Sequence, residues 1–206
     1  MNFQKTYIIF LFAVLLSCEK TKVEELIPVT SSQIVNLHAP QTTDYTTTPP
    51  TTTGDFVKFD FSSGETTTNT TEWDIAFRGT TILVNGGEST GATQEPERNG
   101  NAAAYILSET FSETKEVNES LLKQDGASGN AITTGSGNGW YTYDPSTHLI
   151  SPTAGKVLIF RTADNHYAKV EILSYYKDND SSKTENGRYY TFNYVYQPNF
   201  GVTTFE

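Results

Sequence analysis

Aromatic residues at every second position near the C-terminus place the strongest constraint on the fold of this chain. In the segment RYYTFNYVYQP, Tyr190, Phe192, Tyr194 and Tyr196 recur with a period of two. Because successive side chains of a β-strand point to opposite faces, this pattern places the four rings on one face. We therefore expect a strand over residues 188–198 whose aromatic face lies in a core.

Further strand patterns occur along the chain, and helical periodicity is almost absent. They are FVKFDF (56–61), EWDIAF (72–77), VLIF (157–160) and YAKVEILSYY (167–176). Trp73, Ile75 and Phe77 alternate and are expected to be buried on one sheet face. Residues 163–166 suit a hairpin turn, and the polar segment 112–124 predicts one short surface helix at most. Strands that follow strands predict an all-β fold: a single antiparallel domain, either a sandwich or barrel-like.

Composition excludes some functions and predicts loops. The formal net charge of −10 argues against a nucleic-acid partner, because phosphate binding needs clustered Lys and Arg. The Thr- and Pro-rich segment 41–53 cannot bury a core and predicts an extended loop. A second Thr run, 66–71, lies between strand-like segments. The Gly-rich segment 125–139 is interpreted as a flexible loop, either beside a ligand pocket or simply disordered.

The N-terminus reads as a secretory signal, predicted to span residues 1–17. Lys5 precedes the apolar run 7–16, which is shorter than the ~20 residues that a helix needs to cross a bilayer. Leu15-Leu16-Ser17-Cys18 resembles a bacterial lipobox, so Cys18, the one cysteine of the chain, is the predicted lipidation site. Residues 18–33 would then form a tether and 34–206 the β domain. The alternative is an ordinary signal peptide with an unrelated Cys.

Two motifs typical of enzymes and metal sites lack the sequence context that these sites require. Residues 87–91 match G-x-S-x-G, but Pro96 and the absence of an apolar face argue against the helix that a hydrolase needs after this turn. An EF-hand loop starting at Asp178 would place Lys183 where Gly is required. We therefore expect no enzymatic activity.

Three histidines, His38, His148 and His166, lie in loop-like segments, and each of them has a plain interpretation as a surface residue. His148 follows the aromatic strand that contains Tyr141 and Tyr143. Flat rings beside an imidazole suit a flat, apolar, iron-containing ligand such as haem.

The segment WDIAFRG (73–79), which continues into TTILVNGG (80–87), resembles the signature of the HmuY family, haemophore-like lipoproteins of the Bacteroidota. The block 139–176 is similar to the second half of that family, and the resemblance covers about residues 30–198. It implies an all-β domain of HmuY type whose loops clamp a haem, with two axial ligands from two separate loops.

For individual residues the resemblance leaves several ligand sets open. One ligand loop matches the region after 140–143, which brings His148 close to the iron. The other matches 113–139, where no His occurs, and no Met follows residue 17. The iron ligand would be His148 alone, His148 with Tyr141 or Tyr143, or a set that recruits His38 or His166. Arg78 or Lys156 would supply the polar ends of the slot.

The resulting hypothesis is a lipid-anchored outer-membrane protein, on the periplasmic or the cell-surface face, that touches the membrane through its lipid alone. It would bind haem or another tetrapyrrole for iron acquisition and pass it to a TonB-dependent outer-membrane haem transporter. The alternative is a surface lipoprotein of the same fold that binds a peptide, a glycan or a partner protein and no haem.

Replacing Cys18 with Ala tests the anchor. We expect Cys18→Ala to remain uncleaved or to be released from membranes, because acyl chains supply the membrane affinity at ~0.8 kcal/mol per buried CH₂. The measurement is membrane fractionation combined with incorporation of a labelled fatty acid. Membrane recovery and labelling equal to the wild type would refute the lipobox assignment.

Overall fold

The computed structural model describes residues 25–206. The predicted signal peptide, Cys18 and the first part of the predicted tether lie outside the described residues. The first strand begins at Thr30, four residues before the predicted start of the β domain. Within residues 25–206, no helix is long and apolar enough to cross a membrane.

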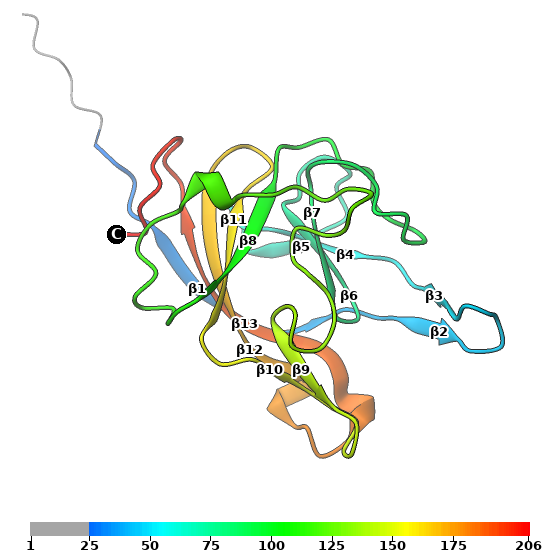
Figure 1. Cartoon of the computed structure of the whole chain (residues 1–206). Coiled ribbons are helices and arrows are strands. Elements are labelled where there is room, and N and C mark those ends of the chain that lie inside the picture. Colours follow the sequence, from blue (N-terminus) through cyan, green and yellow to red (C-terminus); the bar gives the residue numbers. More distant parts are fainter. Residues whose placement is uncertain (1–24) are drawn as a thin grey trace, which may run out of the picture.

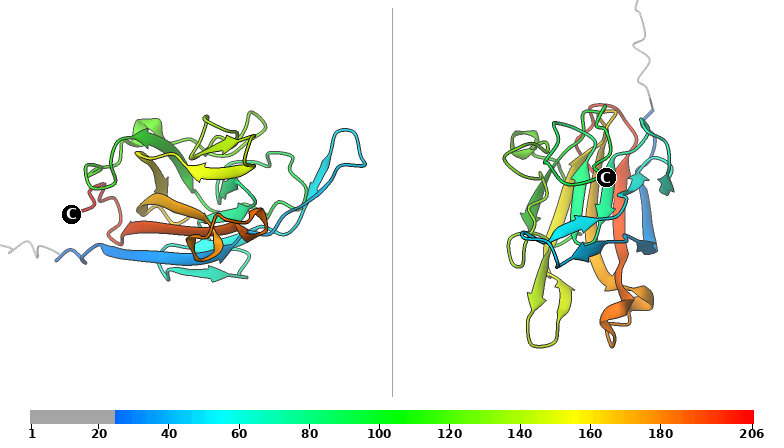
Figure 2. Two further views of the ribbon diagram at one scale, coloured as in Figure 1. Left: turned by 90° about the horizontal axis from the view of Figure 1, so that it is seen from below. Right: turned by 90° about the vertical axis from the view of Figure 1, so that its right-hand side faces the viewer.

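Two antiparallel sheets form a sandwich (Figures 1 and 2). The five-stranded sheet has the order β1 (Thr30–His38), β13 (Gly187–Gln197), β12 (Tyr167–Tyr176), β11 (Lys156–Arg161), β8 (Ala103–Ser108). The four-stranded sheet has the order β5 (Glu65–Thr67), β4 (Val57–Asp60), β6 (Ile75–Arg78), β7 (Thr81–Val84). The predicted all-β antiparallel fold is confirmed, as an open sandwich and not a closed barrel.

Two further strand pairs lie outside these sheets. They are the hairpins β2 (Thr42–Asp44) with β3 (Thr51–Thr53) and β9 (Tyr141–Asp144) with β10 (Leu149–Pro152). The β2–β3 hairpin projects from the body, and the β9–β10 hairpin lies near one end of β12 (Figure 1).

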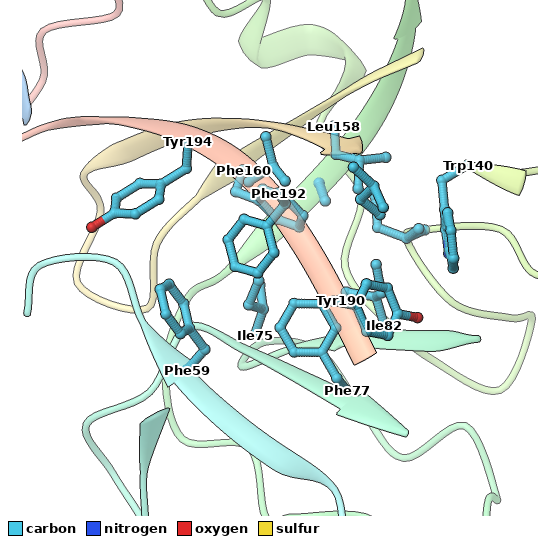
Figure 3. Packing of buried hydrophobic residues seen from close by; sticks show 14 of the residues in the cluster. Phe59, Ile75, Phe77, Ile82, Trp140, Leu158, Phe160, Tyr190, Phe192 and Tyr194 are labelled. Carbon is cyan, nitrogen blue, oxygen red and sulfur yellow. The ribbon is translucent and has the colours of Figure 1, made fainter. Parts of the chain in front are cut away.

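Aromatic rings fill the space between the sheets (Figure 3). As the alternation predicts, Tyr190, Phe192, Tyr194 and Tyr196 all belong to this core. Phe59 from the opposite sheet meets Phe192 and Tyr194 edge to face, with ring centroids 5.6 and 5.9 Å apart. Edge-to-face pairs add stability beyond the buried area of the rings.

The outer face of the five-stranded sheet carries a second, smaller cluster under the segment 109–122 and the C-terminal residues. Lys169 on β12 holds this cover, because its ammonium donates hydrogen bonds to the carbonyls of Phe111 (2.8 Å) and Thr114 (2.6 Å). The buried members are Tyr105, Val117, Val157, Ile159, Tyr167, Val195 and Phe205. Both faces of this sheet are therefore covered.

Trp73 corrects the prediction that EWDIAF buries one face. Ile75 and Phe77 enter the central core, but Trp73 packs on the other side of the four-stranded sheet against Phe56 and Leu83. The alternation does not extend to Trp73, because this residue lies two positions before β6 begins at Ile75. Its indole N–H donates a hydrogen bond to the carbonyl of Thr70 (3.2 Å).

One loop prediction is also corrected. The Thr-rich segment 41–53 is not an extended loop but the β2–β3 hairpin, in which Thr42 pairs with Thr53 and Asp44 with Thr51. Backbone pairing forms this hairpin without a buried core. The segment 112–124, expected to hold one short surface helix at most, contains the 3₁₀ turn η1 (Glu119–Leu121). Two more such turns, η2 (Lys177–Asn179) and η3 (Thr184–Asn186), follow β12.

Truncating Trp73 tests the packing of this residue against Phe56 and Leu83. We expect Trp73→Ala to lower the free energy of unfolding by about 3–5 kcal/mol, because the indole is buried to 1% exposure. Urea unfolding measures the change. Tyr45→Ala is the control: this ring is 80% exposed, and its loss should change the free energy by less than about 0.5 kcal/mol. A Trp73→Ala loss below about 1 kcal/mol would contradict the packing.

Candidate functional site

The β9–β10 hairpin brings three of the predicted ligand residues together. Tyr141 and Tyr143 lie on β9, two residues apart and therefore on the same face of the hairpin. His148 lies in the exposed turn with a φ of 60°, and its Nδ1 is 2.7 Å from the hydroxyl oxygen of Tyr143. The hairpin thus pairs an imidazole with a phenol at its tip.

The other two histidines, His38 and His166, lie outside the β9–β10 hairpin. His38 stacks on Tyr189 with ring centroids 4.3 Å apart. Tyr189 alternates with the core residue Tyr190, so this stack lies on the outer face of the sheet. His166 precedes β12, whereas the hairpin lies at the other end of this ten-residue strand, roughly 30 Å away at ~3.3 Å per residue. His166 is therefore too far from His148 to bind the same iron atom.

A groove of about 350 Å³ lies between the hairpin and the ends of β12 and β13. Hydroxyl groups and aromatic carbons dominate its surface. The lining residues are Gln41, Thr80, Ser136, Tyr141, Tyr143, Ile150, Tyr175 and Arg188. The volume falls near the lower end of the ~300–1,000 Å³ range of small-molecule sites.

Packed aromatic residues form the base of this groove. The Trp140 ring lies 5.8 Å from that of Tyr175 and 5.2 Å from that of Tyr190, and its indole N–H donates to the carbonyl of Thr80 (3.1 Å). Burial raises the pKa of the Tyr175 hydroxyl, against a smaller opposing effect of the nearby Arg188 charge. Tyr175 therefore presents a neutral hydroxyl at physiological pH.

Both sides of the hairpin are tied to the body. The hydroxyl of Tyr176 accepts a hydrogen bond from the Ile150 backbone N–H (2.8 Å). On the other side, Ser136 Oγ accepts from the Tyr143 N–H (2.8 Å), and the Gly137 N–H donates to the carbonyl of Tyr141 (2.9 Å). The hairpin is therefore held by hydrogen bonds along both of its strands.

The Gly-rich segment 125–139, expected to be flexible, is anchored by a buried carboxylate. Asp125 accepts hydrogen bonds from the backbone N–H groups of Val84 (2.9 Å) and Ala131 (2.7 Å). The guanidinium of Arg98 lies 3.0 Å from Asp125 and 2.6 Å from Glu95, and all three side chains are nearly inaccessible. This network fixes the start of the loop that supplies Ser136.

Arg78 and Lys156, the predicted polar ends of a ligand slot, do not reach the groove. Arg78 is buried, donates to the carbonyl of Gly54 (3.2 Å) and lies over the Phe56 ring at 4.1 Å. Lys156 donates to Ser108 Oγ (2.7 Å) and lines a separate depression beside β8. Arg78 is held by residues of the loop between β3 and β4, and Lys156 by Ser108 on the neighbouring strand β8, so neither side chain lines the groove.

Arg188 is the charged residue of the groove, and the sequence analysis missed it. Its place two residues before Tyr190 is not a sufficient signal, because the positive φ of Arg188 interrupts the regular alternation of the strand. Tyr175 was missed as well, because the strand pattern of 167–176 does not show which of its side chains line a groove.

Left-handed backbone conformations gather at this end of the sandwich. Seven non-glycine residues among the described ones have positive φ, and five of them flank the groove or the adjoining turn after β12. These five are Asn36, His148, Asp178, Asn179 and Arg188. Strained backbone of this kind concentrates at binding sites, where the surrounding structure holds it.

Other candidate chemistry is not supported. Within residues 25–206, no group of three or more His, Cys, Asp or Glu side chains is placed to hold a metal ion. Ser89 of the G-x-S-x-G match lies in an exposed irregular segment that contains no helix through residue 100. This arrangement lacks the strand–turn–helix geometry of a hydrolase.

Comparisons with known proteins give a family and a fold. The family model HmuY, described as HmuY protein, matches residues 52–194. Among solved structures, the apo HmuY analog of Tannerella forsythia has 13% identity and a TM-score of 0.50, covering 85% of this chain and 100% of its own. A candidate lipoprotein of Bacteroides fragilis has 13% identity and a TM-score of 0.46, covering 83% and 92%. No curated protein sequence matches the chain.

The Tyr176 hydroxyl offers a test of how the hairpin is held. We expect Tyr176→Phe to lower the free energy of unfolding by about 0.5–1.5 kcal/mol and to speed amide exchange at Ile150, because this N–H loses its acceptor. Hydrogen exchange followed by NMR measures the local effect. Tyr189→Phe is the matched control, since the Tyr189 hydroxyl makes no hydrogen bond within the described residues. Unchanged exchange at Ile150 would contradict the contact.

Proposed function

The chain belongs to the HmuY family, a haemophore-like family, and from this membership we propose that it binds haem or a related tetrapyrrole. The proposed site is the groove beneath the β9–β10 hairpin. Haem is cargo in this proposal: the protein captures and releases it, and no bond of the ligand is made or broken.

The contact between Tyr143 and His148 carries this proposal. When Nδ1 of His148 holds the proton and donates it to the Tyr143 oxygen 2.7 Å away, Nε2 keeps a free lone pair. Metal-bound histidines usually donate their other N–H to a neighbouring acceptor in this way, which fixes the ring and makes it a better ligand. Tyr143 thus prepares His148 to bind the iron of haem.

The groove suits one face of a flat ligand. Tyr141, Tyr143 and Ile150 supply apolar surface along the hairpin, and the hydroxyls of Tyr175 and Ser136 supply polar contacts. Because the groove is small, a tetrapyrrole would fill it and extend past the hairpin into solvent. With His166 near the far end of β12, the iron would have His148 as its histidine ligand from this hairpin, with Tyr141 or Tyr143 available beside it.

In the cell, this site would belong to an anchored protein that delivers haem to a transporter. An acylated Cys18 would tether the domain to the outer membrane on either face, and the groove would deliver haem to a TonB-dependent transporter. The β9–β10 hairpin supports this order of events, because its turn is solvent-exposed and accessible to a partner.

Titration with ferric haem tests the proposal. We expect the purified protein to bind at micromolar concentration with a shift of the Soret band. His148→Ala should alter that spectrum and weaken binding at least tenfold, which is about 1.4 kcal/mol, because the iron loses its imidazole. His38→Ala is the matched control and should leave both unchanged, since this ring lies on the outer face of the five-stranded sheet.

Two outcomes count against the proposal. Identical spectra of the wild type and His148→Ala would make His148 a surface histidine without a role in ligation. Absence of binding by the wild type would leave the alternative of a surface lipoprotein for a peptide, a glycan or a partner protein.

A further inference from the structure

Arg188 is the single charged side chain among the residues that line the groove. No carboxylate of residues 25–206 lies within 4 Å of its guanidinium, and the side chain makes no hydrogen bond within that range. Arg78, by contrast, is buried against a backbone carbonyl and a ring. Arg188 is therefore an exposed cation without a partner in a chain whose net charge is −10.

The backbone holds Arg188 in an unfavourable conformation. Its φ is +73°, a region where the Cβ of an L residue meets steric hindrance and glycine does not. The carbonyl of Arg188 accepts a hydrogen bond from the Ala39 N–H (2.8 Å), which locks the chain in place. A large side chain here worsens the backbone energy and gains no hydrogen bond or ion pair within residues 25–206 in return.

An anionic ligand would explain this arrangement. The net negative charge of the protein repels anions at long range, so binding one requires a local cation. A guanidinium binds a carboxylate through two parallel hydrogen bonds, and the hydroxyls of Tyr141, Tyr143 and Tyr175 surround it with further donors. Haem and related tetrapyrroles combine a flat apolar ring with carboxylates on one edge.

We propose that Arg188 binds a carboxylate of the flat ligand and thereby sets the orientation of the ring in the groove. This inference rests on the proposed function and adds to it a specificity-determining residue. The ring edge that carries the carboxylates lies at the β13 side of the groove, and the opposite edge lies toward the tip of the hairpin.

Protoporphyrin IX, which carries the carboxylates without iron, is the probe that separates this contact from iron ligation. We expect Arg188→Gln to weaken its binding about tenfold and Arg188→Lys to weaken it less, in titrations followed by porphyrin fluorescence. Raising the NaCl concentration should weaken binding to the wild type and affect Arg188→Gln much less, because salt screens an exposed ion pair. Lys183→Gln is the charge-matched control, since this exposed lysine lies in the turn before β13 and does not line the groove.

Arg188→Gly separates binding from folding. Glycine relieves the strained backbone, so the melting temperature of this variant should stay the same or rise, while its affinity for protoporphyrin falls as in Arg188→Gln. A structural role of the side chain would lower both.

The outcomes also separate this inference from the proposed function. If the wild type binds protoporphyrin and ferric haem, but Arg188→Gln binds both with the same affinity and salt dependence, the role of Arg188 is overturned and the function stands. If the wild type binds neither, the function and the role of Arg188 fall together.

Discussion

Outside its strands, this protein is held together by buried side chains whose oxygen atoms accept hydrogen bonds from the backbone N–H groups of loops. Nearly all buried N–H groups need a partner, and the long irregular segments of this fold have few backbone partners. Asp74 accepts hydrogen bonds from Phe61 (2.9 Å) and Ala163 (2.8 Å), and so ties the four-stranded sheet to the turn between β11 and β12. Asn85 accepts from the N–H groups of Asn99 and Gly100, and Asp125 fixes two further segments. Burial disfavours the charged form of the two carboxyl groups. It raises the pKa of Asp74 to about 7 and also raises the pKa of Asp125.

Side-chain hydrogen bonds to loop backbone also position the segments that form the groove. Asp125 and Arg98 position the start of the 125–139 segment, and that segment reaches the hairpin through Ser136. Tyr176 fixes the opposite strand of the hairpin. The walls are therefore formed before a ligand arrives, and binding needs to order little besides the exposed side chains of Tyr143 and His148. Preorganisation of this kind reduces the entropic cost of binding.

Residue patterns predicted the parts of the fold that depend on local periodicity. The period of two from Tyr190 to Tyr196 placed the aromatic core correctly, because alternation within a strand is a property of the backbone. It failed at Trp73, which stands just before its strand, and in the Thr-rich hairpin, which forms by backbone pairing alone. The site depends on contacts between distant segments. Nothing local to His166 shows that it lies at the far end of β12, and Arg188 enters the groove only because β13 runs beside β12 and Gln41 follows β1.

The two ends of the sandwich differ in charge, and this difference favours one of them for an anionic ligand. At the end with the β11–β12 turn, a depression is lined by four carboxylic residues, Asp60, Glu72, Asp74 and Asp164. At the end with the β9–β10 hairpin, the groove has aromatic hydroxyls and the guanidinium of Arg188. The two depressions have comparable size, 430 and 350 Å³, so they differ mainly in the charge of their lining residues. For the anionic ligand proposed above, this difference in lining charge favours the groove over the acidic depression more than cavity size does.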